Sequence, residues 1–272
     1  MAKKEEKPKK NYLLGLLTFA IVLFFIAYMV VFFVGRNRSI NRAKKENDTK
    51  EYVASVTKID LEDDRVKTSM KNYYAFNFGE DVYHLDSLDL ESVPMYNFIV
   101  AALANIDSSK VAYCIADRGE LKEAITIDEL NAAVHKVGDI NISIDDLINN
   151  AKESGNTVGT YGYGFYSLII EGGNIYVIGA CDAMDGDKLT VTKIEQAEVL
   201  GDYVNIYVRV AFGVRSGELI NYYDNFQREG NFKEKLKSNE EPNFSRNKYA
   251  LYKITFMKVG DNYYFQSIVS RS

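Results

Sequence analysis

Hydrophobic and polar residues follow three different patterns along the 272-residue chain. Residues 13–34 form an unbroken run without a charged side chain. Residues 62–158 instead place apolar side chains three and four positions apart, the period of an amphipathic helix. After about residue 158, apolar and polar residues alternate, the period of a strand with one buried face. The order of these patterns predicts a membrane helix, then helices, then an antiparallel sheet.

The uncharged run predicts a transmembrane helix over residues 12–34. A helix of this length extends roughly 33 Å, enough to cross a hydrocarbon layer of about 30 Å. The apolar part of a cleaved signal peptide is shorter, about 7–15 residues, and no small-residue cleavage site follows the run. Residues 1–11 are then a basic tail and residues 35–61 a polar juxtamembrane stalk. The lipid bilayer is thus an expected partner, contacted through residues 12–34.

The charge of the chain changes sign at about residue 50. Residues 1–50 hold 11 basic and 4 acidic side chains, whereas residues 51–272 hold 22 basic and 34 acidic ones. An acidic body repels phosphates, so we expect no nucleic-acid partner. The basic residues on the two sides of the span are nearly balanced, with five before it and six after it. Because long C-terminal domains translocate largely regardless of charge, we expect a cytoplasmic N-terminus and an extracytoplasmic body, with the reverse orientation as the alternative.

Helix signals follow the stalk. Apolar residues recur at helical spacing over residues 62–74. Ser92 is expected to cap a second helix that has Pro94 in its first turn. Thr126 and Glu129 form a capping box before a third helix, and Ser143 is expected to cap a fourth.

Alternation is clearest between Tyr203 and Arg215, where an apolar residue occupies every even position. This pattern predicts a long, bent strand whose even side is buried and whose odd side, which includes Asn205, is wetter. Two further hairpins are expected at Gly172–Gly173 and at residues 260–262. Helices over residues 62–158 followed by a sheet over residues 159–272 predict an α+β fold, in which helices cover one face of a curved antiparallel sheet.

This order of elements resembles uncharacterised single-pass bacterial envelope proteins with an extracytoplasmic α+β domain of the cystatin-like or NTF2-like type. It also resembles the inner-membrane scaffold proteins of type IV secretion systems. The resemblance covers most of the chain at the level of element order. It implies a curved sheet that holds N-terminal helices, and it identifies no functional residue.

Three aromatic residues within "GTYGYGFYS" are a candidate binding surface. Tyr161, Tyr163 and Phe165 are expected to project from one face of a strand, while glycines leave the other face bare. They can form a platform for a glycan, a peptide or another chain. Alternatively, they cover the core while the glycines let the sheet bend.

A second candidate lies in the long connection over residues 216–247, because long connections are often functional. Leu219, Tyr222, Tyr223 and Phe226 recur at helical spacing, which predicts a short amphipathic helix. Its apolar stripe is expected either to close the core or to bind a partner, such as an envelope protein.

The sequence contains no G-x-S-x-G, H-E-x-x-H or phosphate-loop motif. Cys114 and Cys181 lie in apolar surroundings, so both a disulfide and two free thiols remain open. We therefore expect a non-enzymatic, membrane-anchored binding or scaffold module of the bacterial cell envelope, without a cofactor or metal. The alternatives are an intracellular-facing regulator or secretion-system scaffold, and an envelope hydrolase.

Overall fold

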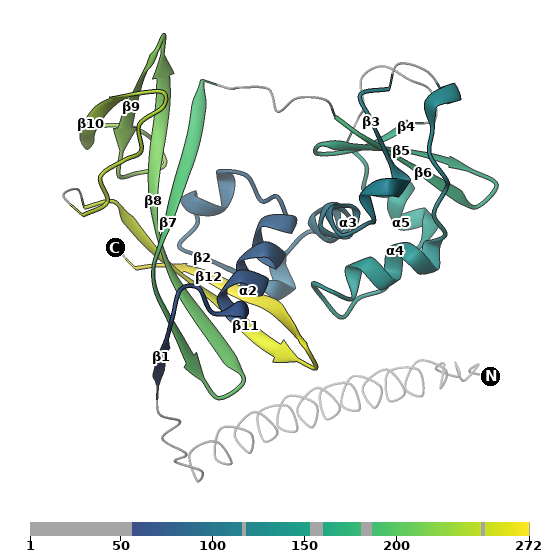
Figure 1. Ribbon diagram of the computed structural model, residues 1–272, viewed down its shortest axis with the longest axis horizontal. Helices are drawn as coiled ribbons and strands as arrows, with labels where there is room; N and C mark the ends of the chain where they lie inside the picture. The colour runs from purple at the N-terminus through teal and green to yellow at the C-terminus, as the bar shows by residue number, and fades with distance from the viewer. Residues whose placement is uncertain (1–55, 116–117, 153–159, 181–186, 246–247, 272) are drawn as a thin grey trace, which may run out of the picture. The chain divides into compact units, whose positions relative to one another are not determined.

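The protein has an α+β fold that contains two sheets (Figure 1). No helix in the part of the chain described below is both long and apolar enough to cross a membrane. The predicted tail and the predicted span at residues 12–34 lie outside that part. The computed structural model describes residues 56–115, 118–152, 160–180, 187–245 and 248–271.

The larger sheet has eight antiparallel strands. These are β1 (Thr57–Ile59), β2 (Ser87–Asp89), β7 (Lys188–Leu200), β8 (Tyr203–Ser216), β9 (Leu219–Tyr223), β10 (Phe232–Lys237), β11 (Ala250–Val259) and β12 (Asn262–Ser270). Six of them follow the order β1-β7-β8-β11-β12-β2. β9 pairs with the far end of β8, and β10 pairs with β9. β11 and β12 form the hairpin predicted at residues 260–262.

β8 confirms the strand predicted for residues 203–215. The side chains of Val204, Ile206 and Val208 are buried as expected. The prediction of a wetter opposite face is wrong at Asn205, which is only 5% exposed. The reason is that side chains of the neighbouring strands close over it. Its amide nitrogen donates to Glu198 Oε1 at 3.4 Å, and its amide oxygen accepts from Thr255 Oγ1 at 2.9 Å.

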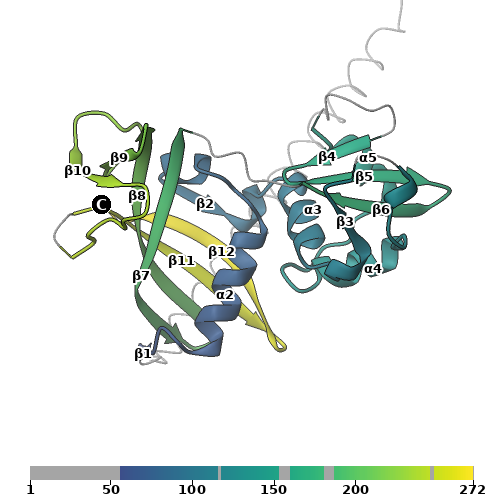
Figure 2. The same ribbon diagram turned by 45° about the horizontal axis from the view of Figure 1, so that its top comes forward.

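β-Bulges in β7 and β12 bend the larger sheet. The pairing register slips at Glu195 in β7, between Ile194 and Gln196, and again at Gln266 in β12. An extra residue on one strand bends that strand and increases its local twist. The curved sheet holds the helix α2 (Asp64–Ala75) on its concave face, as Figure 2 shows.

The side chains of α2 explain why it forms and packs there. Asp63 accepts a hydrogen bond from the backbone of Arg65 at 2.9 Å, which caps the helix. The hydrogen bond from the Arg65 guanidinium lowers the pKa of Asp63 to about 2. Val66, Met70 and Tyr73 lie one helical turn apart and are buried against the sheet. The helix predicted for residues 62–74 is confirmed.

A smaller sheet is formed by β3 (Val111–Tyr113), β4 (Thr160–Tyr163), β5 (Tyr166–Glu171) and β6 (Asn174–Gly179), in the order β3-β6-β5-β4. The expectation of a single sheet is wrong, because β6 pairs in parallel with β3, which lies among the helices. The hairpin predicted at Gly172–Gly173 is confirmed, and both glycines have the positive φ that its turn requires.

The remaining helices pack beside the smaller sheet and between strands. They are α3 (Met95–Ala104), α4 (Ile127–Val134) and α5 (Ile144–Asn149), with short 3-10 turns η1 (Asp81–His84), η2 (Leu90–Ser92), η3 (Ser108–Lys110) and η4 (Arg118–Glu120). The caps predicted at Thr126 and Ser143 are confirmed, each as a capping box. The cap predicted at Ser92 is wrong, since Ser92 ends η2 and Pro94 precedes α3 without a side-chain cap.

One continuous hydrophobic core contains residues of both sheets and of the helices between them. Asn97 of α3 donates to the carbonyl of Phe76 at 2.8 Å and so links α3 to the end of α2. Tyr96, also on α3, stacks on Tyr163 of the smaller sheet with ring centroids 5.4 Å apart.

Alkaline pH is expected to unfold this core. Burial raises the pKa of Tyr83 and of Tyr252 to about 12, and that of Tyr73 well above its ordinary value of 10. The unfolded chain therefore loses phenolic protons at lower pH than the folded chain does, so the free energy of unfolding falls as the pH rises from about 10 to 12. Circular dichroism and the ultraviolet absorbance of tyrosinate should change together over this interval. Ionisation of every tyrosine near pH 10 without unfolding would contradict the burial.

Candidate functional site

A groove of about 570 Å³ lies between α2 and the outer strand β7, and we call it the β7 groove. On one side it is bounded by Lys188, Leu189, Thr190 and Thr192 of β7. The opposite side and the floor are aromatic. They are formed by Tyr73, Tyr74, Phe78 and Tyr83, together with Phe165 from the smaller sheet, and Asn77, Gly79 and Glu80 complete the lining.

The turn after α2 positions the aromatic side of the groove. Asn77 and Gly79 both have positive φ, which reverses the chain between α2 and η1. Phe78 thereby stacks on Phe76 with ring centroids 5.2 Å apart. Gly164 also has positive φ, and a Cβ at this position would lie 2.9 Å from Asn77 Nδ2. Glycine at this turn therefore lets the smaller sheet bring Phe165 to the groove.

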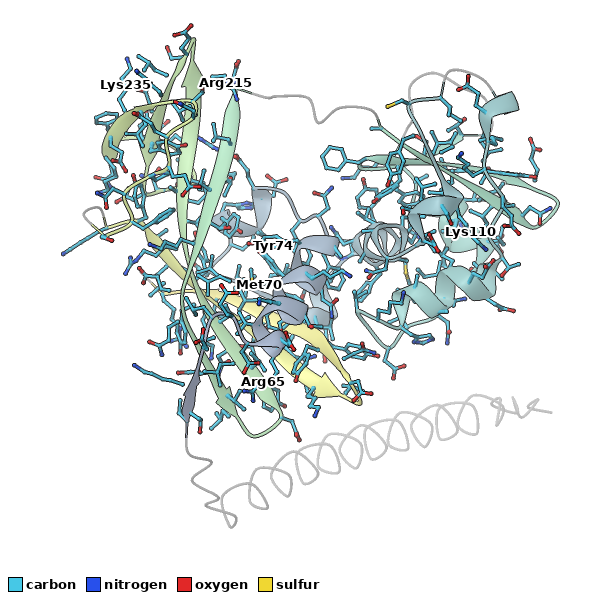
Figure 3. All side chains as sticks on the ribbon, in the orientation of Figure 1. Arg65, Met70, Tyr74, Lys110, Arg215 and Lys235 are labelled. Atoms are coloured by element: carbon cyan, nitrogen blue, oxygen red, sulfur yellow. The ribbon has the colours of Figure 1, made fainter. Side chains whose placement is uncertain are left out.

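The floor of the β7 groove is uncharged and tied together by hydrogen bonds. The hydroxyl of Tyr73 donates to that of Tyr83 at 3.5 Å, and the hydroxyl of Tyr252 donates to the backbone carbonyl of Tyr83 at 2.8 Å. Burial raises the pKa values of all three phenols, so they stay protonated even well above neutral pH. By contrast, Tyr74 and Phe165 at the rim are each 52% exposed. Tyr74, labelled in Figure 3, reaches from α2 to Thr192, with 3.0 Å between their hydroxyl oxygens.

A hydrogen-bonded ion pair fixes one end of the β7 groove. Arg228, whose side chain is 5% exposed, donates to Glu80 Oε1 at 2.5 Å and to the carbonyl of Gly213 at 3.0 Å. Thr190 Oγ1 donates to the same Glu80 oxygen at 2.9 Å. The carboxylate of Glu80 is therefore already bonded to a cation and a hydroxyl. What the groove offers a ligand is mainly aromatic surface and hydroxyl groups.

The aromatic surface expected from Tyr161, Tyr163 and Phe165 does not form as predicted. Tyr163 is fully buried, and its hydroxyl donates to the backbone carbonyl of Leu147. Tyr161 is half-buried and packs against the core. Phe165 lies in the turn after β4 rather than on the strand, and this displacement is what brings it to the β7 groove.

The amphipathic helix predicted from Leu219, Tyr222, Tyr223 and Phe226 is wrong, because Leu219–Tyr223 is the strand β9. Gly217, with positive φ, makes a tight turn that pairs β9 with β8. Alternation along a strand then sends Tyr222 and Tyr223 to opposite faces.

The four residues consequently do not share one surface. Tyr222 is buried in a small second cluster with Ile220, Phe244 and Tyr249. Phe226 instead packs near Phe212, with ring centroids 6.2 Å apart, on the side of the main core. Residues 216–245 thus contain two strands rather than an arm. A partner that contacts Leu219 and Tyr223 remains a prediction.

Cys114 directly follows β3 and is disulfide-bonded. The other cysteine of the chain is Cys181, which lies two residues after β6 and outside the described residues. The parallel register of β3 and β6 pairs Tyr113 with Gly179, and the backbone N–H of Cys114 donates to Gly179 at 3.3 Å. The end of β3, which leads into Cys114, therefore lies beside the end of β6 at one edge of the smaller sheet. Between the two possibilities left open by the sequence, the structure has the disulfide.

Within the described ranges, no three His, Cys, Asp or Glu side chains lie together as a metal site. His135 ends α4, where its ring contacts Asn141 at 3.2 Å, and His84 packs on Phe226. Local sequence patterns did not predict the β7 groove, because its lining comes from three separate segments. Comparisons with protein-family models, characterised proteins and solved structures find no match to this chain.

Proposed function

We propose that this chain is a membrane-anchored binding module of the bacterial cell envelope, with a cytoplasmic N-terminus and an extracytoplasmic α+β body. The uncharged run at residues 12–34 supplies the anchor in this proposal. The β7 groove supplies the binding site.

The observation that carries the proposal is the disulfide at Cys114. Cytoplasmic thiols are kept reduced, whereas disulfides persist in exported domains. The near balance of basic residues around the span leaves its orientation open. A disulfide in the body favours the orientation that exposes the body to an oxidising environment.

The composition of the β7 groove favours binding over chemistry. Its floor phenols have raised pKa values and are poor proton donors or acceptors at neutral pH. Its carboxylate, Glu80, already accepts bonds from Arg228 and Thr190. Exposed aromatic side chains beside a buried, hydrogen-bonded floor are instead typical of a surface that binds another molecule.

The orientation is tested by fusing alkaline phosphatase to Ser272, since the enzyme is active only outside the cytoplasm. We expect an active fusion, and we expect an otherwise identical fusion that lacks residues 12–34 to be inactive. The active fusion should also resist extraction by alkaline carbonate. An inactive full-length fusion that is expressed and membrane-bound would reverse the orientation and favour an intracellular regulator or scaffold.

A further inference from the structure

We propose that the open edge of β7 binds an extended peptide segment of a partner protein. The peptide adds to the larger sheet as an antiparallel strand, in line with β1, and its side chains enter the β7 groove. This inference rests on the proposed binding function and names the class of partner.

The hydrogen-bond register shows which backbone groups of β7 face outward. The N–H of Arg215 donates to the carbonyl of Asp187 at 2.6 Å, just beyond the end of the β7–β8 ladder. In an antiparallel pair, every second residue directs both its N–H and its C=O to the neighbouring strand. The backbones of Leu189, Val191 and Lys193 therefore face β8. Those of Thr190, Thr192 and Ile194, which alternate with them, face away from it.

The same edge of β7 already accepts one antiparallel strand. β1 pairs with β7 only at Ala197–Val199, and the chain then leaves the sheet to begin α2. Among the described residues, no other strand pairs with the stretch from Lys188 to Gln196 on this side. Figure 1 shows β1 beside just one end of β7. A peptide strand that continues the line of β1 extends an interface that the protein itself uses.

Two other sheet edges, those of β10 and β4, have features that oppose the addition of a strand. β10 carries Lys233, Lys235 and Lys237, and lysines on an edge strand oppose pairing with another chain. The outer side of β4 is partly covered by a bridge between Lys152 and Gly162. On β7, Lys188 begins the open stretch, and Lys193 and the bulge at Glu195 limit its other end. Residues 188–192 contain no proline and lie directly beside the groove.

The groove is suited to the side chains of an added strand. Side chains alternate between the two faces of a strand, so every second residue of the peptide points to the concave side of the sheet. There it meets the exposed rings of Tyr74 and Phe165, with the ring of Phe78 in the same lining. Backbone hydrogen bonds supply affinity and the pockets beside them supply selectivity in this mode of recognition. The aromatic lining favours apolar side chains at the groove-facing positions.

The test uses the full chain in lipid nanodiscs, in which both faces of the membrane are open, so its result does not depend on orientation. A display library of random twelve-residue peptides is selected against this protein. The peptide that binds the protein most strongly is then synthesised with a fluorescent label. Its affinity is measured by fluorescence anisotropy, together with two versions that are N-methylated at alternate backbone positions.

We expect one N-methylated version to lose about tenfold or more in affinity and the other to bind nearly as the parent does, because only one set of N–H groups faces β7. This comparison uses the unmodified protein throughout, so it needs no substitution in β7 or in the groove.

Thr192→Pro removes an outward N–H from the open edge and should also weaken binding about tenfold. Thr192→Val keeps this N–H and should not weaken binding. Tyr74→Ala and Phe165→Ala should each weaken binding at unchanged thermal stability.

Three results would overturn the proposal. The first is a selection that yields no peptide sensitive to Tyr74→Ala. The second is equal loss of affinity from both N-methylated versions, since this would mean that the peptide is not held as a strand. The third is a change of sedimentation mass on Thr192→Pro without an effect on peptide binding, since β7 would then be the contact between two copies of this chain.

Discussion

Val208→Asp is expected to unfold the body of the protein at room temperature, with a loss of about 4 kcal/mol or more in the free energy of unfolding. Val208 lies in the middle of β8, is 1% exposed and belongs to the main core. Its partners across the sheet are Ile194 and Tyr252, and neither offers a cation. A carboxylate at this position is either buried without a counter-charge or protonated, and both outcomes destabilise the fold.

Tyr203→Asp is the matched control, because Tyr203 begins the same strand and is 43% exposed. We expect it to change the free energy of unfolding by less than about 1 kcal/mol. Urea denaturation followed by circular dichroism measures both variants. If the two substitutions cost the same, the burial of the even face of β8 is contradicted.

Removing the disulfide is expected to cost about 4 kcal/mol, because a bond between Cys114 and Cys181 closes a long loop and restricts the unfolded chain. Cys114→Ser, Cys181→Ser and the double substitution should all lower the free energy of unfolding by the same amount. Reduction of the unmodified protein should reproduce this loss, and reduction of the double variant should have no effect. Urea denaturation with and without a reductant measures the unmodified protein and the three variants.

The same variants report on the cellular environment. Protein taken from cells under conditions that block thiol exchange should migrate as the oxidised form on a non-reducing gel. Protein expressed without residues 12–34 should migrate as the reduced form, because it stays in the cytoplasm. A free, alkylatable Cys114 in the full-length protein would contradict both the bond and the proposed orientation.

The sequence predicted correctly the elements whose contacts are made between residues close together in the chain. The capping boxes at Thr126 and Ser143 and the hairpin at Gly172–Gly173 each depend on residues a few positions apart. β8 was also predictable, because its apolar alternation is unbroken from Val204 to Val214. In each case the residues that form the pattern are the residues that make the contacts.

The errors occurred where distant segments decide the structure. Leu219–Tyr223 fits both a helical and an alternating pattern, and only pairing with β8 selects the strand. Asn205 is polar, yet neighbouring strands close over it, so Asn205→Asp brings a carboxylate close to Glu198 rather than into water. The β7 groove depends on the approach of Phe165 to α2, which leaves no periodic trace in the sequence.

The short strand β1 has a mechanical consequence. It occupies residues 57–59 of the segment predicted to be a polar stalk. If residues 12–34 anchor the chain as proposed, tension on that end reaches the larger sheet through the ladder between β1 and β7. That ladder contains three residue pairs, whereas β7 and β8 are paired along almost their whole length. Under load, β1 should peel away first while the rest of the sheet holds. Its departure would lengthen the exposed edge of β7 by Ala197 and Val199, so a pull on the proposed anchor would enlarge the surface available to the proposed peptide strand.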